Sequence, residues 1–229
     1  MILALSGSLR KQSANTALTR AAAAAASGAM TLAPRLDALP YFCEDVERSG
    51  LPASVAALRA QAFQASAFFF ATPEYNGNTS GALKNVRCAA APLPPCAPRA
   101  APVCRTLSLT RNHPSLAAAQ ALDWLSRSGA EGASPLKGKP FAVVSAGGGG
   151  GGAGGAASVA AVCERFGMAR VGAPGGVAVR LFDGTARFDS ASGDLTDAQV
   201  RAAVAALAAE LPGAAARHAA AAAAAAKLK

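Results

Sequence analysis

The stretch Ala67-Phe68-Phe69-Phe70-Ala71-Thr72-Pro73-Glu74-Tyr75-Asn76 decides the fold. Its first five residues, 67–71, are all apolar, and Thr72-Pro73 ends the run. A short apolar run bounded by a turn signal is typical of a central strand in a parallel sheet, where helices cover both faces. Polar and aromatic residues follow it at once, at the end of the strand where ligands lie in such sheets.

Comparable apolar runs on either side predict four further strands, at 2–5, 30–36, 140–145 and 177–179. Helices are predicted at 15–26, 54–64, 156–166 and 197–211. Thr196 is expected to cap the last helix, and Pro212-Gly213 to end it. Strands that alternate with helices indicate an α/β domain, in which a parallel sheet lies between two helical layers.

Composition excludes several classes of protein. The 229 residues carry a formal net charge of +9, but no basic stripe is interleaved with aromatics, so nucleic-acid binding is not expected. The five cysteines are an odd number and do not predict a disulfide framework, and no metal site is expected. The apolar run behind Met1 is too short for a signal peptide or a membrane span, which predicts a cytoplasmic protein without membrane contact.

The loop after the first strand, 6–15, offers hydroxyls, backbone N–H groups and a guanidinium where a helix begins. A helix N-terminus attracts anions, and Arg10 could make a bidentate contact to a phosphate. The loop matches neither a Walker motif nor the G-x-G-x-x-G fingerprint, which disfavours a nucleoside triphosphate or a Rossmann-bound dinucleotide. The alternative is a polar turn with a capping serine.

Two other loops carry residues that suit a planar ligand. In 72–81, Tyr75 could stack on a ring and Asn76 could reach its heteroatoms, although an Asn-Gly surface turn is the alternative. In 145–155, a run of glycines would let the backbone approach a flat ligand closely. A flexible linker is the alternative for that run.

One motif is Gly7-Ser8-Leu9-Arg10 with Ser13 and Asn15, and a second, further along the chain, is Pro73-Glu74-Tyr75-Asn76. Together they resemble the motifs of the NADPH-dependent FMN reductases, a family that includes quinone and chromate reductases. Residues 81–85, 121–127 and the strand ending in Ser145-Ala146 are similar as well. The resemblance extends to about Leu211, apart from a segment in the middle.

This resemblance implies a three-layer, flavodoxin-like α/β fold with a five-stranded parallel sheet in the order 2-1-3-4-5. It implies that the phosphate of FMN binds to Ser8, Arg10, Ser13 and Asn15. The isoalloxazine ring is expected against Pro73, Glu74, Tyr75 and Asn76, with Ser145 and Gly147 on its other side. No catalytic side chain is implied, because the flavin itself carries the hydride. The chain departs from the family at Thr79-Ser80, where an apolar residue and proline are common, and in its run of glycines.

The implied activity is an FMN-dependent oxidation of NADPH or NADH, with a small-molecule electron acceptor such as a flavin, a quinone or chromate. A homodimer or homotetramer is implied by the resemblance as well. One alternative is a non-catalytic electron carrier that binds FMN. Another is an inactive product in which an insertion prevents flavin binding. The sequence leaves open the physiological acceptor and the choice between NADPH and NADH.

Residues 86–120 interrupt the pattern, with six of the 14 prolines, four arginines and no acidic residue. If they are removed, Leu83, Ala121, Leu122 and Leu125 fall on one face of a single helix. Codons for Val86 begin with GT and Gln120 can be encoded by CAG, so we hypothesise a retained intron; a surface insertion is the alternative. The predicted domain therefore covers 1–211, interrupted at 86–120, and an alanine-rich tail follows at 212–229.

Overall fold

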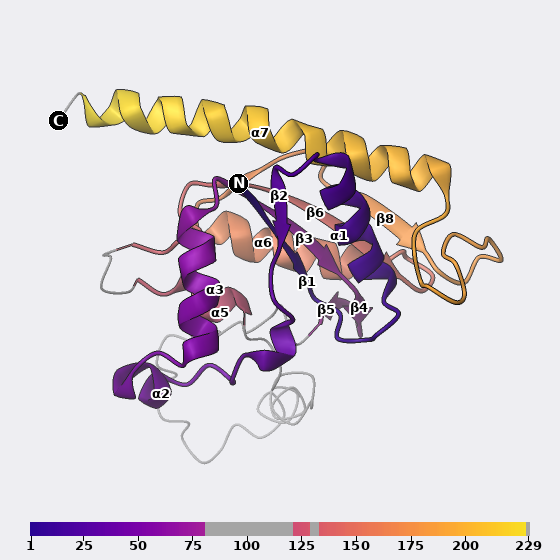
Figure 1. Ribbon diagram of the computed structural model, residues 1–229, viewed down its shortest axis with the longest axis horizontal. Coiled ribbons are helices and arrows are strands. Elements are labelled where there is room, and N and C mark those ends of the chain that lie inside the picture. Colours follow the sequence, from indigo (N-terminus) through magenta and orange to yellow (C-terminus); the bar gives the residue numbers. More distant parts are fainter. Residues whose placement is uncertain (81–120, 129–132, 228–229) are drawn as a thin grey trace, which may run out of the picture.

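A parallel sheet runs through the centre of the computed structural model (Figure 1), which describes residues 1–80, 121–128 and 133–227. Its strands are β1 (Ile2–Ser6), β2 (Met30–Leu32), β3 (Ala67–Thr72), β6 (Pro140–Gly147), β7 (Ala169–Arg170) and β8 (Val177–Arg180). They lie in the order β2-β1-β3-β6-β7, with β8 also paired to β6, and every pair is parallel. This confirms the flavodoxin-like order that the sequence predicts.

The fifth position of the sheet differs from the prediction, because two short strands share it. β7 pairs with Pro140 and Phe141 at the start of β6, and β8 pairs with the last four residues of β6. The sheet therefore has six strands rather than five. Between β7 and β8 the chain leaves the sheet through Gly172 and Gly176, both with positive φ. A Cβ on Gly176 would lie 2.2 Å from the carbonyl oxygen of Val143, so only glycine fits there.

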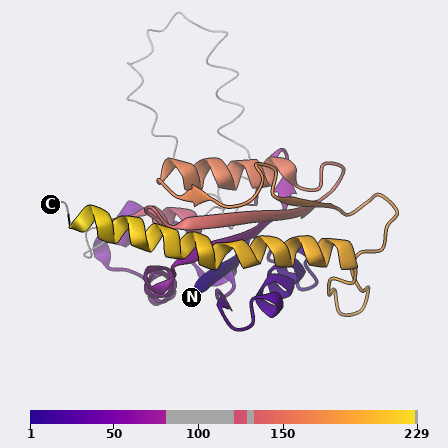
Figure 2. The ribbon, with the colours of Figure 1, turned by 90° about the horizontal axis from the view of Figure 1, so that it is seen from above.

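Helices cover both faces of the sheet (Figures 1 and 2). On one face α1 (Ala14–Ala25) and α7 (Ala198–Ala226) pack against Ile2, Ala4 and Phe69 and the residues beside them. On the other face lie α3 (Ala53–Gln64), α5 (Ala121–Ser126) and α6 (Ala153–Arg165). A short 3-10 helix, η1 (Leu36–Ala38), and α2 (Glu44–Ser49) connect β2 to α3.

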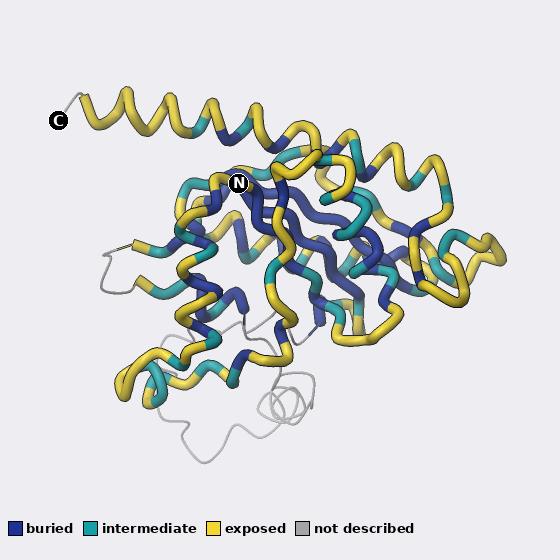
Figure 3. Tube along the Cα trace, in the orientation of Figure 1, coloured by how far each residue is buried: buried dark blue, intermediate teal, exposed yellow. Residues whose placement is uncertain are grey.

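β3 is the most deeply placed strand, as its sequence predicts. All six of its residues are buried, and the strands at the centre of the sheet are buried along their length in Figure 3. Phe68 and Phe70 point into the core beneath α3, α5 and α6, whereas Phe69 points to the α1 and α7 side. Alternation with a period of two puts large apolar side chains into both cores from one strand.

Two expectations about α7 are wrong. Asp197, not Thr196, caps the helix, and its carboxylate accepts hydrogen bonds from the backbone of Gln199 and Val200 at 2.9 and 3.0 Å. The helix also continues through Pro212 to Ala226 instead of ending at Leu211. Burial of residues on both sides of the proline and the high helix propensity of the alanines after it outweigh the cost of the proline.

The strand expected at 30–36 is shorter than predicted, since β2 ends at Leu32 and Leu36 already belongs to η1. Pro34 has no backbone N–H with which to extend the hydrogen bonds between β2 and β1, and the side chain of Leu36 packs in the core instead. Within the described residues, no helix is long and apolar enough to cross a membrane. The predicted insertion at 86–120 and the motif at 81–85 lie outside those residues.

Candidate functional site

The three loops singled out by the sequence meet at the carboxyl edge of the sheet. They follow β1, β3 and β6, which are neighbours in that order. The backbone N–H of Gly7 donates a hydrogen bond to the carbonyl oxygen of Ala71 at 2.8 Å, and the hydroxyl of Ser80 donates to the carbonyl of Gly7. The first two loops are therefore bonded directly to each other.

The first loop leads into α1 through two buried polar residues. Ser13 is the N-cap, and its hydroxyl accepts a hydrogen bond from the backbone N–H of Thr16 at 3.3 Å. The side-chain amide of Asn15 donates to the carbonyl of Ala146 at 3.0 Å, and its oxygen accepts from the N–H of Ala146 at 2.8 Å. Asn15 thereby fixes the start of α1 to the end of β6, and its side chain acts as a positioning group.

Ser8 and Arg10 are placed differently from Ser13 and Asn15. Ser8 is half-buried and Arg10 is exposed, and both line a pocket of about 310 Å³ that opens beside α1. The first turn of α1 contains no acidic residue. The end of this helix therefore keeps the positive potential of its free N–H groups.

The second loop forms a tight hairpin of β4 (Glu74–Tyr75) and β5 (Asn78–Thr79). Asn76 and Gly77, at its tip, have φ values of 53° and 74°, the signs that a type I′ turn requires. The Asn-Gly turn is thus real, and it lifts Tyr75 into solvent with 51% of its surface exposed. A turn and a ring-binding loop are compatible here, because the hairpin presents a tyrosine beside the strand ends.

Thr79 and Ser80, where the sequence departs from the family pattern, hold the hairpin in place. The hydroxyl of Thr79 forms a short, buried hydrogen bond with the hydroxyl of Thr72 at the end of β3. The hydroxyl of Ser80 bonds to Gly7 in the first loop. The two hydroxyls fasten the hairpin to β3 and to the first loop.

The run of glycines is not a flexible linker throughout. α6 begins at Ala153 with Gly152 as its N-cap in the left-handed region. A Cβ on Gly152 would lie 2.9 Å from Cβ of Ser145, and one on Gly155 would lie 2.5 Å from the carbonyl oxygen of Pro73. The second half of the run thus allows α6 to approach β6 and the hairpin closely. Gly149 and Gly150 have open space around them instead.

Glu74 joins the second loop to the third, and Ser145 braces the third loop internally. The carboxylate of Glu74 accepts a hydrogen bond from the backbone N–H of Gly154 at 2.8 Å, in the first turn of α6. A negative charge is stabilised there by the free N–H groups and the helix dipole. The hydroxyl of Ser145 is fully buried and donates to the carbonyl of Gly151 at 2.9 Å. Gly147 adjoins the same turn, because a Cβ on it would lie 2.8 Å from the nitrogen of Gly152.

Phe182, which the sequence analysis missed, lies at the same edge. It is 85% exposed, and its ring lies 3.7 Å from where a Cβ on Gly148 would stand. The turn that holds it is well braced, since Arg187 pairs with Asp183 at 2.6 Å and bonds to the carbonyl of Arg180. The hydrogen bond from Arg187 lowers the pKa of Asp183 to about 2. In the sequence, the available sign of this position is a phenylalanine directly before Asp183-Gly184-Thr185, a stretch typical of a turn.

The fold and the three linked loops are those of a flavodoxin-like α/β domain. Among solved structures, the flavoenzyme NAD(P)H:(acceptor) oxidoreductase FerB from Paracoccus denitrificans matches with a TM-score of 0.66 and 21% identity, over 95% of this chain and 97% of that one. An NADH:FMN oxidoreductase in its apo form matches with a TM-score of 0.54 and 17% identity, over 92% and 89%. At these identities the matches show the fold.

Sequence comparison gives the family. A family model described as NADPH-dependent FMN reductase matches residues 1–87. A probable NADPH:quinone oxidoreductase from Oryza sativa subsp. japonica is 31% identical over 206 residues, which are 87% of this chain and 84% of the relative. The quinone reductase of Escherichia coli K12 is 40% identical over 87 residues, which are 37% of this chain and 46% of that protein. The second relative is thus matched over less than half of its length.

The chain belongs to the NADPH-dependent FMN reductase family. Membership confirms the predicted fold and makes the chain an FMN-dependent oxidoreductase that takes its electrons from NAD(P)H. Its electron acceptors are small molecules.

Proposed function

We propose that this chain reduces quinones and free flavin with electrons from NAD(P)H, through FMN held by the three loops after β1, β3 and β6. The observation that carries the proposal is the set of hydrogen bonds that joins these loops, from Ser80 to Gly7, from Asn15 to Ala146 and from Gly154 to Glu74. When bound, FMN supplies the hydride chemistry, and the chain supplies position and electrostatics.

The electrostatics of the edge support a phosphate at the first loop rather than at the third. Two long helices, α1 and α6, begin at this edge. The N-terminus of α6 already binds the carboxylate of Glu74, whereas α1 has no acidic residue in its first turn and has Arg10 in the loop before it. The phosphate of FMN is therefore assigned to Ser8, Arg10 and the start of α1, where Ser13 caps the helix and Asn15 fixes it.

The flavin ring is assigned to Pro73, Glu74, Tyr75 and Asn76 on one side and to Ser145 and Gly147 on the other. The exposed ring of Tyr75 offers a stacking surface. Gly149 and Gly150 have open space around them, which leaves room for an acceptor at the third loop. Chromate as an acceptor, a homodimer or homotetramer, and a cytoplasmic location are further parts of the proposal; ultracentrifugation tests the assembly.

The test begins with the visible spectrum of the purified full chain, with added FMN and then with anaerobic NADPH. We expect flavin bands that bleach with NADPH and return when a quinone is added. Arg10→Ala should weaken FMN binding about 10- to 100-fold, since it removes a charge-assisted hydrogen bond of about 1.5–3 kcal/mol. Arg48→Ala is the control, because Arg48 is an exposed arginine on α2 paired with Glu44 and Asp45.

Other results would contradict the proposal. Flavin bands that persist in NADPH would favour an electron carrier, and equal FMN affinity in both variants would remove Arg10 from the phosphate site. A colourless protein that does not bind added FMN would mean that residues 86–120 disrupt the FMN site or that FMN is assigned to the wrong residues.

We also propose that the domain predicted for 1–211 is one unit interrupted at 86–120, with α7 extending its core to Ala215. Ser80 bonds to Gly7, and Trp124, Leu122 and Leu125 of α5 are buried in the core, so the chain belongs to the fold on both sides of the segment. The family match ends at residue 87. A variant that joins Asn85 to Ala121 should fold and bind FMN at least as tightly as the full chain. Sequencing the mature transcript tests the intron hypothesis, and a dominant message that retains the segment would refute it.

A further inference from the structure

Phe182, directly after β8, exposes more of its surface than any other large apolar side chain in the described part of the chain. Its exposed fraction is 85%, whereas Phe68, Phe70 and Phe141 are fully buried. Burying a phenylalanine side chain is favourable, so a ring left in water is a surface that a ligand can cover with a gain in free energy. Single exposed apolar residues are common on proteins, and the surroundings of Phe182 therefore decide what its ring does.

The backbone that carries Phe182 is held on both sides. The N–H of Leu181 donates a hydrogen bond to the carbonyl of Gly147 in the third loop at 2.9 Å. Asp183, the next residue, pairs with Arg187 at 2.6 Å. A ligand that binds the ring therefore does not have to order this part of the chain first.

The third loop packs directly on β8 and on the ring that follows it. A Cβ on Gly151 would lie 3.1 Å from the backbone of Ala178 and Val179, so a side chain there would push the loop away from the strand. The ring of Phe182 lies 3.7 Å from where a Cβ on Gly148 would stand. The close contact between loop and strand thus keeps the ring beside the third loop.

Bare backbone adjoins the ring on its solvent side. Gly149 and Gly150 are exposed, and a Cβ on either would meet nothing within 4 Å. We call the ring of Phe182 together with residues 148–150 the Phe182 subsite. A phenyl ring beside backbone that carries no side chains suits a flat ligand, because aromatic rings stack on one another and glycine permits a close approach.

The Phe182 subsite lies next to the residues assigned to the flavin ring. Gly148 follows Gly147 in the chain, and the carboxyl end of β6 separates Phe182, after β8, from Tyr75, after β3. Neighbouring strands lie about 4.8 Å apart, so these two exposed aromatic side chains flank the end of β6 at roughly 10 Å from each other. A ligand on Phe182 is therefore expected beside the flavin, within reach of its electrons.

We propose that the Phe182 subsite binds the electron acceptor and that it selects acceptors with a planar, electron-poor ring. The inference rests on the proposed function and adds the residue that recognises the acceptor. The negative face of the phenyl ring attracts an electron-poor ring, and the contact removes apolar surface from water. An inorganic oxidant has no ring and gains nothing from Phe182.

Binding is tested first, without turnover. The probe is duroquinone, because its fully substituted ring cannot alkylate the exposed Cys43. Equilibrium dialysis against the full chain with FMN, in the absence of NAD(P)H, measures its Kd. Phe182→Ala should raise this Kd about 3- to 10-fold, the effect of one aromatic pair, and Phe182→Tyr should leave it unchanged because the ring is kept. Neither variant should change Tm, since the side chain is almost fully exposed.

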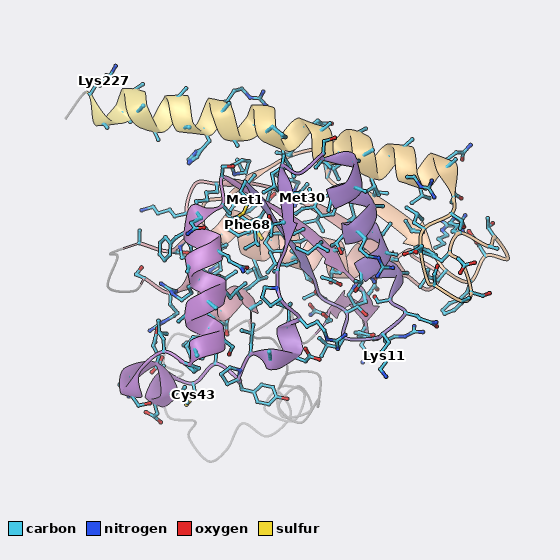
Figure 4. The ribbon with its side chains drawn as sticks, viewed as in Figure 1. Met1, Lys11, Met30, Cys43, Phe68 and Lys227 are labelled. Atoms are coloured by element: carbon cyan, nitrogen blue, oxygen red, sulfur yellow. The ribbon has the colours of Figure 1, made fainter. Side chains whose placement is uncertain are left out.

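Tyr41→Ala is the matched control. Tyr41 is a second exposed aromatic side chain, at 61%, in the connection between η1 and α2. Cys43 marks this connection at one end of the molecule in Figure 4, and the loop that follows β8 lies at the other end (Figure 1). The affinity for duroquinone should be the same in Tyr41→Ala as in the parent.

Steady-state kinetics then separate recognition of the acceptor from a general loss of activity. With NADPH as the donor, Phe182→Ala should lower kcat/KM for duroquinone about 3- to 10-fold, through KM rather than kcat. The value of kcat/KM for ferricyanide, an oxidant without a ring, should be unchanged. Tyr41→Ala should change neither value.

Equal duroquinone affinity in the parent and in Phe182→Ala would overturn the inference. An equal loss of kcat/KM with both acceptors, or weaker FMN binding in Phe182→Ala, would overturn it as well, because the ring would then support the flavin instead of the acceptor.

These outcomes are distinct from those of the proposed function. Duroquinone binding that depends on Phe182, in a chain whose FMN is not reduced by NAD(P)H, would keep the subsite and refute the reductase. Duroquinone reduction that is equal in the parent and in Phe182→Ala would do the reverse.

Discussion

Gly155 offers a sharp test of how the site is packed. It lies in the first turn of α6, and a Cβ added to it would stand 2.5 Å from the carbonyl oxygen of Pro73. Ordinary contact begins at 3.4 Å, so Gly155→Ala requires a separation of roughly 0.9 Å between α6 and the ring-binding loop. Both partners are backbone, so no flexible side chain can absorb the change.

The magnitude follows from two opposed terms. Replacing glycine by alanine in a helix normally stabilises it by up to about 1 kcal/mol. Overpacking costs about 1–3 kcal/mol, so Gly155→Ala should be neutral to destabilising. Gly213→Ala in α7 is the matched control, because its new Cβ would meet only the side chain of Arg217 at 3.5 Å. The helix term is common to both variants, and the stability difference between them should equal the steric cost, about 1–3 kcal/mol.

The assay is urea and thermal unfolding of both variants without cofactor, followed by FMN titration. For a chain of this length about 1 kcal/mol corresponds to a change of about 2–4 °C in Tm, so Gly213→Ala should melt above Gly155→Ala by at least that amount. FMN affinity should fall only in Gly155→Ala, since Pro73 is displaced. If the two variants are equally stable and bind FMN equally, the close contact between α6 and the hairpin is wrong.

Asn15→Ala should lower the free energy of unfolding by about 1–3 kcal/mol and weaken FMN binding in titration, because two backbone groups of β6 lose their buried partner. Unchanged stability would mean that the Asn15 side chain does not hold α1 to β6. In the native protein at pH 8, iodoacetamide should alkylate Cys43, which is exposed, and leave Cys163 unmodified, because burial raises the pKa of the Cys163 thiol. Peptide mass spectrometry measures both sites, and rapid alkylation of Cys163 would show that α6 opens readily. The Asp183 charge stabilises its turn above its unfolded pKa of about 3.9, and this contribution is lost as the pH falls toward its folded pKa of about 2. Asp183→Asn should therefore be less stable than the parent at pH 6, with the difference gone near pH 2, and a difference that does not change with pH would rule out the ion pair with Arg187.

The sheet was predictable where each strand is either fully buried or followed by distinctive polar residues. β3 shows this best, because six consecutive buried residues can only be central and Pro73 marks where they stop. The meeting of the three loops also followed from the sequence, since parallel strands place their carboxyl ends at one edge. What each side chain does there could not be predicted, because Asn15 and Ser80 bond to backbone that lies far away in sequence.

The remaining errors have physical causes as well. β7 is two residues long, too short for its sequence to show an alternation of apolar and polar residues. The turn that separates β7 from β8 depends on the close approach of Gly176 to the carbonyl of Val143. α7 passes through Pro212 because tertiary burial outweighs local propensity. Phe182 carries no pattern at all, since one exposed ring in a polar turn is visible only in three dimensions.

The bonds of Asn15, Ser80 and Glu74 close the three loops into a single frame before any ligand arrives. Loops ordered during folding need not be ordered again when a ligand binds, so little of the binding free energy is spent on them. Such a frame cannot open at one loop without disturbing the core beneath it. Heating should therefore release the flavin and unfold the domain in one cooperative transition, rather than produce a folded apoprotein first.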